Sequence, residues 1–96
     1  MATQAFAAKT EIDEIIDRNL SHFQEIYQRI HKNPELSHQE KKTSALVAEE
    51  LKSMDFEVTT GVGGYGVVGV FKNGKGKTAL VRADMDALPI QEETSF

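Results

Sequence analysis

The chain of 96 residues is long enough for one small domain or for part of a larger one. Its content of 40% hydrophobic and 27% charged residues is typical of a folded protein rather than a disordered one. A net charge of −4 disfavours nucleic acid and anionic membranes as partners, and the lack of cysteine excludes a disulfide framework or a thiolate metal site within these residues.

Residues 1–9 precede the first periodic segment, and we expect them to be a disordered tail or a signal-peptide remnant. Ala5-Phe6-Ala7 fits the small-x-small pattern of a signal-peptidase site. No basic stretch followed by an apolar stretch stands in front of it. The sequence therefore favours a cytoplasmic protein. A secreted or periplasmic one is the alternative, if Met1 lies inside a longer signal peptide.

Two helices are predicted next. Apolar residues recur with helical spacing from Ile12 to Ile30, and Thr10 can serve as the N-cap. This helix should end before Pro34, because the residue that precedes a proline is pushed out of the helical region. The second helix should begin at Ser37, which can form a capping box with Glu40. Its inner face would carry Ala45, Leu46 or Val47, Ala48, Leu51 and Met54.

The pattern then changes to that of strands. Residues 56–60 alternate, residues 67–71 are almost wholly apolar, and residues 78–83 form a third apolar run behind the hairpin signal Asn73-Gly74. Apolar runs without alternation are typical of strands that are covered on both faces. Two helices can cover only one face, so the predicted fold is an incomplete α/β unit of two helices followed by three strands.

Residues 61–66 read G-V-G-G-Y-G and match the dinucleotide-binding fingerprint, which places a pyrophosphate at the start of a helix. The residues that follow have a strand pattern instead. The helix amides that would bind the phosphate are therefore missing. We interpret this segment as a turn or connector.

Asp84 and Asp86 stand two residues apart at the end of the third predicted strand, where open α/β sheets place their ligands. Two such carboxylates repel each other unless a cation or hydrogen-bond donors neutralise them. Three interpretations are open: a solvated turn closed by Pro89, a site that binds a metal or orients its ligands, and a phosphoaspartate site with Asp84 as nucleophile. Leu88 disfavours the last, because phosphatases of the haloacid-dehalogenase type prefer Thr or Val there.

The histidines do not form an evident metal pair. His31 and His38 are seven residues apart with Pro34 between them, whereas a pair on one helix needs a spacing of four. By residue type, His31 is expected to cap the first helix or to pair with a carboxylate. His22 is expected on the solvated face of that helix.

Three segments occur in a fixed order: residues 30–37 (I-H-K-N-P-E-L-S) with Glu40, residues 63–69 (G-G-Y-G-V-V-G), and residues 81–90 (V-R-A-D-M-D-A-L-P-I) with Glu92 and Glu93. Together they resemble the metal-dependent amidohydrolases that include hippurate hydrolases, auxin-conjugate hydrolases and N-acyl-amino-acid deacylases. The resemblance covers residues 17–93, and the run R-A-D-M-D-A-L-P is its most specific part.

The resemblance implies the start of a zinc-peptidase-like α/β catalytic domain with a mixed sheet, without the lid domain through which relatives often dimerise. Such enzymes cleave the amide bond of N-acyl amino acids or small peptides. Two divalent ions (zinc, manganese or cobalt) activate water and a glutamate is the general base. The base and the metal ligands would lie beyond residue 96. We therefore expect residues 10–96 to be an inactive amino-terminal part of that domain, with no metal bound; a full-length homodimer or larger homo-oligomer is compatible with the resemblance.

In peptidase branches of this superfamily, the segment that matches residues 84–86 reads His-x-Asp, with the histidine on a metal and the aspartate orienting it. Asp84 replaces that histidine here, so we assign no metal ligand and no catalytic residue in this chain. Asp84 and Asp86 are instead expected to lie in or beside the active site and to hold its ligands in shape. Residues 31–40 are expected to act as scaffold. The alternatives are a phosphoaspartyl phosphatase fragment and a small non-enzymatic α+β binding module.

Overall fold

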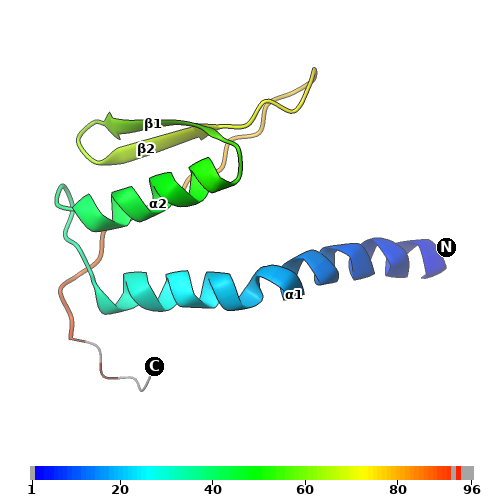
Figure 1. Ribbon diagram of the computed structural model, residues 1–96, viewed down its shortest axis with the longest axis horizontal. Coiled ribbons are helices and arrows are strands. Elements are labelled where there is room, and N and C mark those ends of the chain that lie inside the picture. Colours follow the sequence, from blue (N-terminus) through cyan, green and yellow to red (C-terminus); the bar gives the residue numbers. More distant parts are fainter. Residues whose placement is uncertain (1, 92, 94–96) are drawn as a thin grey trace. The chain divides into compact units, whose positions relative to one another are not determined.

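The computed structural model describes residues 2–91 and residue 93. The chain divides into two compact units: one contains the first helix and Asn33, and the other is Pro34–Gln91. In chain order the elements are α1 (Ala2–Lys32), α2 (Lys41–Ser53), β1 (Glu57–Val62) and β2 (Gly66–Val70) (Figure 1).

Helix α1 begins earlier than the sequence predicted. It starts at Ala2 and runs for 31 residues, so Thr10 lies inside the helix and is not its N-cap. Residues 2–9 are rich in alanine, the residue with the highest helix propensity, which allows the helix to extend through them. The predicted end is confirmed. The Asn33 side-chain amide donates to the Arg29 carbonyl at 2.7 Å, and Pro34 follows outside the helix.

The second unit is a helix packed on a hairpin. Strands β1 and β2 are antiparallel (Figure 1). Glu57 lies opposite Val70 and Thr59 opposite Val68, and the register shifts between Thr59 and Val62. Gly63 and Gly64 form the connecting turn with φ values of 62° and 115°, a backbone conformation that glycine adopts at little cost. The glycine-rich segment is therefore a hairpin turn, and the strand predicted after it is confirmed one residue earlier.

The core of this unit is small. Leu46 and Ala48 of α2 are buried, as predicted, and Val47 and Leu51 are half-buried. The prediction was wrong for Ala45 and Met54, which are exposed; Thr43 and Ser44 are buried at the start of the helix instead. The inner face is therefore shifted toward the amino end of α2.

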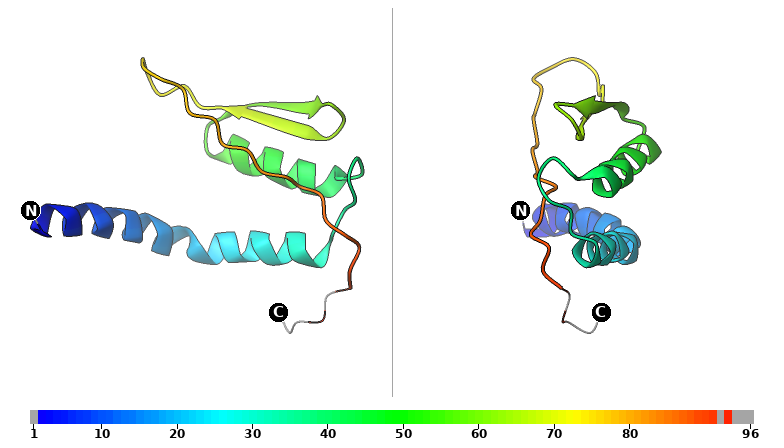
Figure 2. Two further views of the ribbon diagram at one scale, coloured as in Figure 1. Left: turned by 180° about the vertical axis from the view of Figure 1, so that it is seen from behind. Right: turned by 90° about the vertical axis from the view of Figure 1, so that its left-hand side faces the viewer.

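The third strand was predicted incorrectly. Residues 78–83 are extended but belong to no strand (Figure 2). Leu80 and Val81 are each 92% exposed. A strand exists only when a neighbour supplies its hydrogen bonds. The sheet of the described residues has two strands, so β2 is not joined by a further one and Asn73-Gly74 opens a bend instead of a hairpin. The structure shows an α/β unit with a two-stranded antiparallel sheet rather than three strands of a mixed one.

Among the described residues, no helix is both long enough and apolar enough to cross a membrane.

Candidate functional site

Asp84, Met85 and Asp86, called the acidic motif below, lie on the extended chain that follows the hairpin. The Arg82 guanidinium donates to Asp84 Oδ1 at 2.8 Å, and the two side chains are 79% and 66% exposed. An ion pair this exposed contributes at most about 1 kcal/mol. It does supply one of the donors that two neighbouring carboxylates need. Asp86 is exposed as well.

The Glu35 side chain caps the amino end of helix α2, although Glu35 lies six residues before Lys41, the first residue of the helix. Its Oε2 accepts from the Lys42 amide at 3.0 Å, and its Oε1 accepts from the Thr43 amide and the Thr43 hydroxyl, both at 2.6 Å. The first amides of a helix have no partner within the helix, so a side-chain acceptor there satisfies them. The negative charge also suits the positive end of the helix dipole.

This cap replaces the one that was predicted. Helix α2 begins at Lys41 instead of Ser37, and its N-cap residue Glu40 makes no side-chain capping bond. The Glu40 carboxylate accepts from the His38 amide at 3.0 Å, in the turn before the helix. The capping box predicted at Ser37 is therefore replaced by the Glu35 carboxylate. This carboxylate offers two acceptor oxygens to the start of the helix, whereas Ser37 would offer one hydroxyl.

Some features of the surroundings of Glu35 raise the pKa of its carboxyl group and others lower it. Burial raises the pKa of the Glu35 carboxyl, whereas the bonds from the Thr43 hydroxyl and from the Lys42 and Thr43 amides, together with the Lys42 charge, lower it. The net result is a pKa below the ordinary 4.5. Glu35 is therefore ionised at neutral pH, in the form that the cap requires.

The main chain of Glu35 binds the acidic motif. Its carbonyl oxygen accepts from the Ala87 amide at 2.8 Å, directly after Asp86. Met85 is half-buried, while its neighbours Asp84 and Asp86 are exposed. One residue thus joins residues 30–37 and residues 81–90, two of the segments that carry the resemblance.

Sequence reasoning assigned residues 31–40 to scaffolding but missed Glu35 as the capping residue. The available signal was a carboxylate directly after Pro34 and a short turn before the helix. Spacing alone does not show that the chain folds back far enough for Glu35 to reach Lys42.

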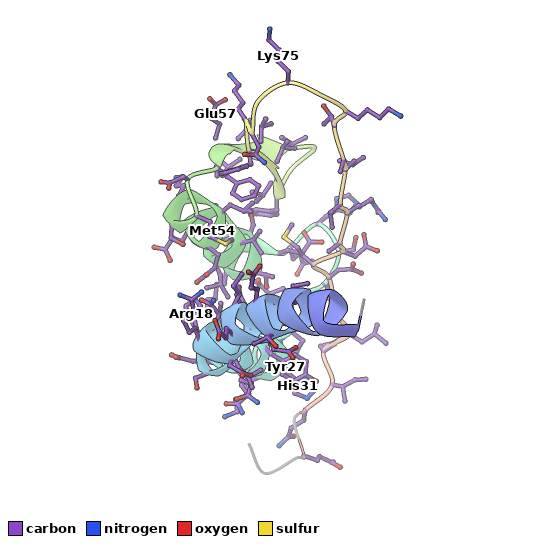
Figure 3. The ribbon with its side chains drawn as sticks, turned by 90° about the vertical axis from the view of Figure 1, so that its right-hand side faces the viewer. Arg18, Tyr27, His31, Met54, Glu57 and Lys75 are labelled. Carbon is purple, nitrogen blue, oxygen red and sulfur yellow. The ribbon has the colours of Figure 1, made fainter. Side chains whose placement is uncertain are left out.

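The described residues do not by themselves fit a metal centre. They contain no group of three or more histidine, cysteine, aspartate or glutamate side chains placed to hold an ion. His31 lies in the last turn of α1, where its ring stacks on Tyr27 with centroids 5.9 Å apart and planes 6° apart (Figure 3). His38 occupies a left-handed turn with φ of 67°. Asp84 and Asp86 are therefore not joined by a third ligand in this part of the chain.

Comparison with known proteins gives several close relatives. The chain is 47% identical to the hippurate hydrolase of Campylobacter jejuni over 86 residues, which are 88% of the chain and 22% of that protein. It is 48% identical to thermostable carboxypeptidase 2 of Saccharolobus solfataricus over 86 residues, 88% of the chain and 21% of the relative. It is also 48% identical to IAA-amino acid hydrolase ILR1-like 5 of Arabidopsis thaliana over 67 residues, 70% of the chain and 15% of that protein.

The chain thus matches 15–22% of the length of these relatives. No protein-family model and no solved structure matches it significantly. A stretch that covers 88% of the chain must include α2, the hairpin and Arg82, wherever it begins. The similarity therefore extends over the whole second unit up to the acidic motif.

Proposed function

Because the chain is a relative of hippurate hydrolases, carboxypeptidases and IAA-amino acid hydrolases, we propose that it forms the amino-terminal part of the catalytic domain of a metal-dependent hydrolase. The enzyme cleaves the amide bond of N-acyl amino acids or small peptides. The observation that carries this proposal is the identity of 47–48% to a hippurate hydrolase and a carboxypeptidase across 88% of the chain.

In this proposal Asp84 and Asp86 border the active site. Arg82 holds one carboxylate oxygen of Asp84 at 2.8 Å, and the Glu35 carbonyl holds the amide that follows Asp86. The second contact restrains the main chain of the motif, and the Asp86 carboxylate is exposed. We assign these two residues to shaping the site and orienting its ligands, and we place the metal ligands in parts of the hydrolase that residues 1–96 do not contain.

The experiment is an activity assay of the full-length protein on N-benzoylglycine, an indole-3-acetyl amino acid and an N-blocked dipeptide. Hydrolysis of at least one, lost after dialysis against a chelator and restored by zinc, manganese or cobalt, is the expected result. Residues 1–96 alone should release no product under the same conditions. Cleavage of p-nitrophenyl phosphate without cleavage of any amide would instead support the phosphoaspartate interpretation of Asp84.

A further inference from the structure

Glu35 makes hydrogen bonds in two directions at once. Its carboxylate accepts three bonds, from the Lys42 amide, the Thr43 amide and the Thr43 hydroxyl, at 2.6 to 3.0 Å. Its carbonyl accepts the Ala87 amide at 2.8 Å. The side chain is therefore anchored on a helix, while the main chain of the same residue holds the segment that carries Asp84 and Asp86.

The anchor is strong enough to orient the carbonyl. Bonds to an ionised carboxylate are roughly twice as strong as bonds between neutral groups, and these engage both oxygens. Pro34, directly before, has a fixed φ and limits the rotation of the chain as it enters Glu35. With the side chain and the preceding residue restrained, the carbonyl has little freedom to turn away from Ala87.

Among the described residues, one backbone hydrogen bond joins the motif to the helical part of this unit. Between Val70 and Gln91, the backbone contact to an earlier segment is the one from Ala87 to Glu35. Residues 80 and 81 are almost fully exposed, so packing upstream of the motif does not hold it either. Met85 of the motif is half-buried, so packing contributes there, and the Ala87–Glu35 bond is the directed contact that fixes the main chain of the motif relative to α2.

We infer that Glu35 is a positioning residue for the acidic motif: by capping α2 with its carboxylate, it aims its carbonyl at Ala87 and fixes Asp84 and Asp86 relative to the helix. The consequence for catalysis rests on the proposed function. The link from helix α2 through the Glu35 side chain and carbonyl to the Ala87 amide, called the tether below, does not rest on it. The tether can be measured without any assay of activity.

Three substitutions separate positioning from simple helix capping. Glu35→Gln keeps the shape of the side chain but leaves one acceptor oxygen and turns an amide donor toward the donors of Lys42 and Thr43. Thr43→Val removes the hydroxyl donor alone and leaves both backbone bonds. Glu40→Gln is the matched control, because the Glu40 carboxylate accepts from His38 and lies outside the tether.

The first measurement is hydrogen–deuterium exchange of the full-length protein, followed in the peptide that contains Ala87. Glu35→Gln should speed exchange there, Thr43→Val should do so to a smaller degree, and Glu40→Gln should match the parent. Unchanged exchange at Ala87 in both Glu35→Gln and Thr43→Val would overturn the inference. If Glu35→Gln fails to fold, Thr43→Val carries this test.

The second measurement is the steady-state kinetics of the same full-length variants. Glu35→Gln should lower kcat by about 10- to 100-fold with KM little changed, since displaced supporting residues commonly cost this much. A pure cap would lower the unfolding temperature and leave kcat per folded molecule unchanged, which would also refute positioning. If the parent cleaves no amide, the proposed function fails, and the exchange experiment still decides the tether.

Discussion

The two kinds of carboxylate in this chain sit in different surroundings. Glu35 accepts three hydrogen bonds from Lys42 and Thr43 at the start of α2, whereas Asp84 pairs with Arg82 on exposed chain. Bonds among restrained, partly buried groups contribute to stability, while exposed ion pairs contribute little. Substitution of Glu35 should therefore act on folding as well as on the placement of the acidic motif, whereas substitution in the acidic motif should act on function alone.

The Glu35 cap predicts a pH dependence of stability. The pKa of Glu35 is lowered in the folded state from the ordinary 4.5, so folding favours the ionised form. Its contribution is then fully present above pH 4.5 and is lost as the pH falls through the lower folded-state pKa. The difference in free energy of unfolding between the full-length parent and Glu35→Gln should be constant above this range and shrink below it. Denaturant unfolding from pH 3 to pH 7 measures it, and a difference that grows on acidification would contradict the assignment.

Asp86 should matter for turnover and not for stability. In the full-length protein, Asp86→Asn is expected to lower kcat by about 10- to 100-fold, because the lost charge no longer holds the site in shape. The unfolding temperature should barely change, since Asp86 is exposed. The matched control is Asp55→Asn, the same chemical change in an exposed left-handed turn with φ of 65°, which asparagine tolerates. Equal kinetics for Asp86→Asn and the parent would reduce the motif to a structural turn.

At the scale of elements, α2 and the hairpin meet at Gly69. A Cβ atom built on Gly69 would lie 3.0 Å from Leu51 Cδ1 and 3.1 Å from Phe56 Cδ2. Phe56 also packs against Phe71, with ring centroids 5.3 Å apart. The absent side chain at position 69 therefore lets helix and sheet approach, which explains why this strand carries a glycine opposite Val58.

Gly69→Ala should therefore be destabilising. Alanine would gain about 0.4–1 kcal/mol from a less flexible unfolded chain. Overpacking costs about 1–3 kcal/mol where the Leu51 and Phe56 side chains do not give way, so we expect a net loss. The measurement is denaturant unfolding of the full-length protein. Val68→Ala, at the exposed neighbouring position, serves as control and should change stability less. A Gly69→Ala protein as stable as the parent would mean that Leu51 and Phe56 can move aside.

At the scale of the whole molecule, exposed large hydrophobic residues outnumber buried hydrophobic ones in the described part of the chain. Leu46 and Ala48 are the buried hydrophobic residues of the described part, while large apolar side chains are exposed along α1, β2 and the extended segment. The chain also corresponds to about a fifth of each relative. The apolar surface of α1 and, separately, that of residues 78–83 are each suited to being covered by more protein.

Residues 1–96 by themselves should be partly folded and prone to associate. Exposed apolar patches and an unpaired extended segment promote association, and a core this small leaves little stability in reserve. We expect helical circular dichroism, binding of a hydrophobic dye and oligomers that grow with concentration in sedimentation. Replacing the exposed pair with Leu80→Lys and Val81→Lys should weaken association and leave the helical signal intact. A sharp two-state transition in a verified monomer would contradict this expectation.

Local patterns in the sequence determined the elements. Helical spacing gave α1 and α2, Pro34 gave the end of α1, alternation gave β1, and the glycines before β2 were correctly interpreted as a turn. The same residues indicated the relationship to amidohydrolases, which the comparisons confirmed. These features are set by interactions between residues that are close together in the sequence, so they can be predicted from the sequence alone.

The tertiary structure alone decided three further points. It replaced the capping box of Ser37 by the carboxylate of Glu35, left residues 78–83 without a strand partner, and joined Ala87 to Glu35. Each depends on a partner outside the local pattern: two acceptor oxygens that reach a helix end, a strand that is or is not beside another, and a carbonyl that faces a distant amide. Propensity and spacing describe which conformations a segment favours, but the partner that satisfies its hydrogen bonds is chosen only when the chain folds back on itself.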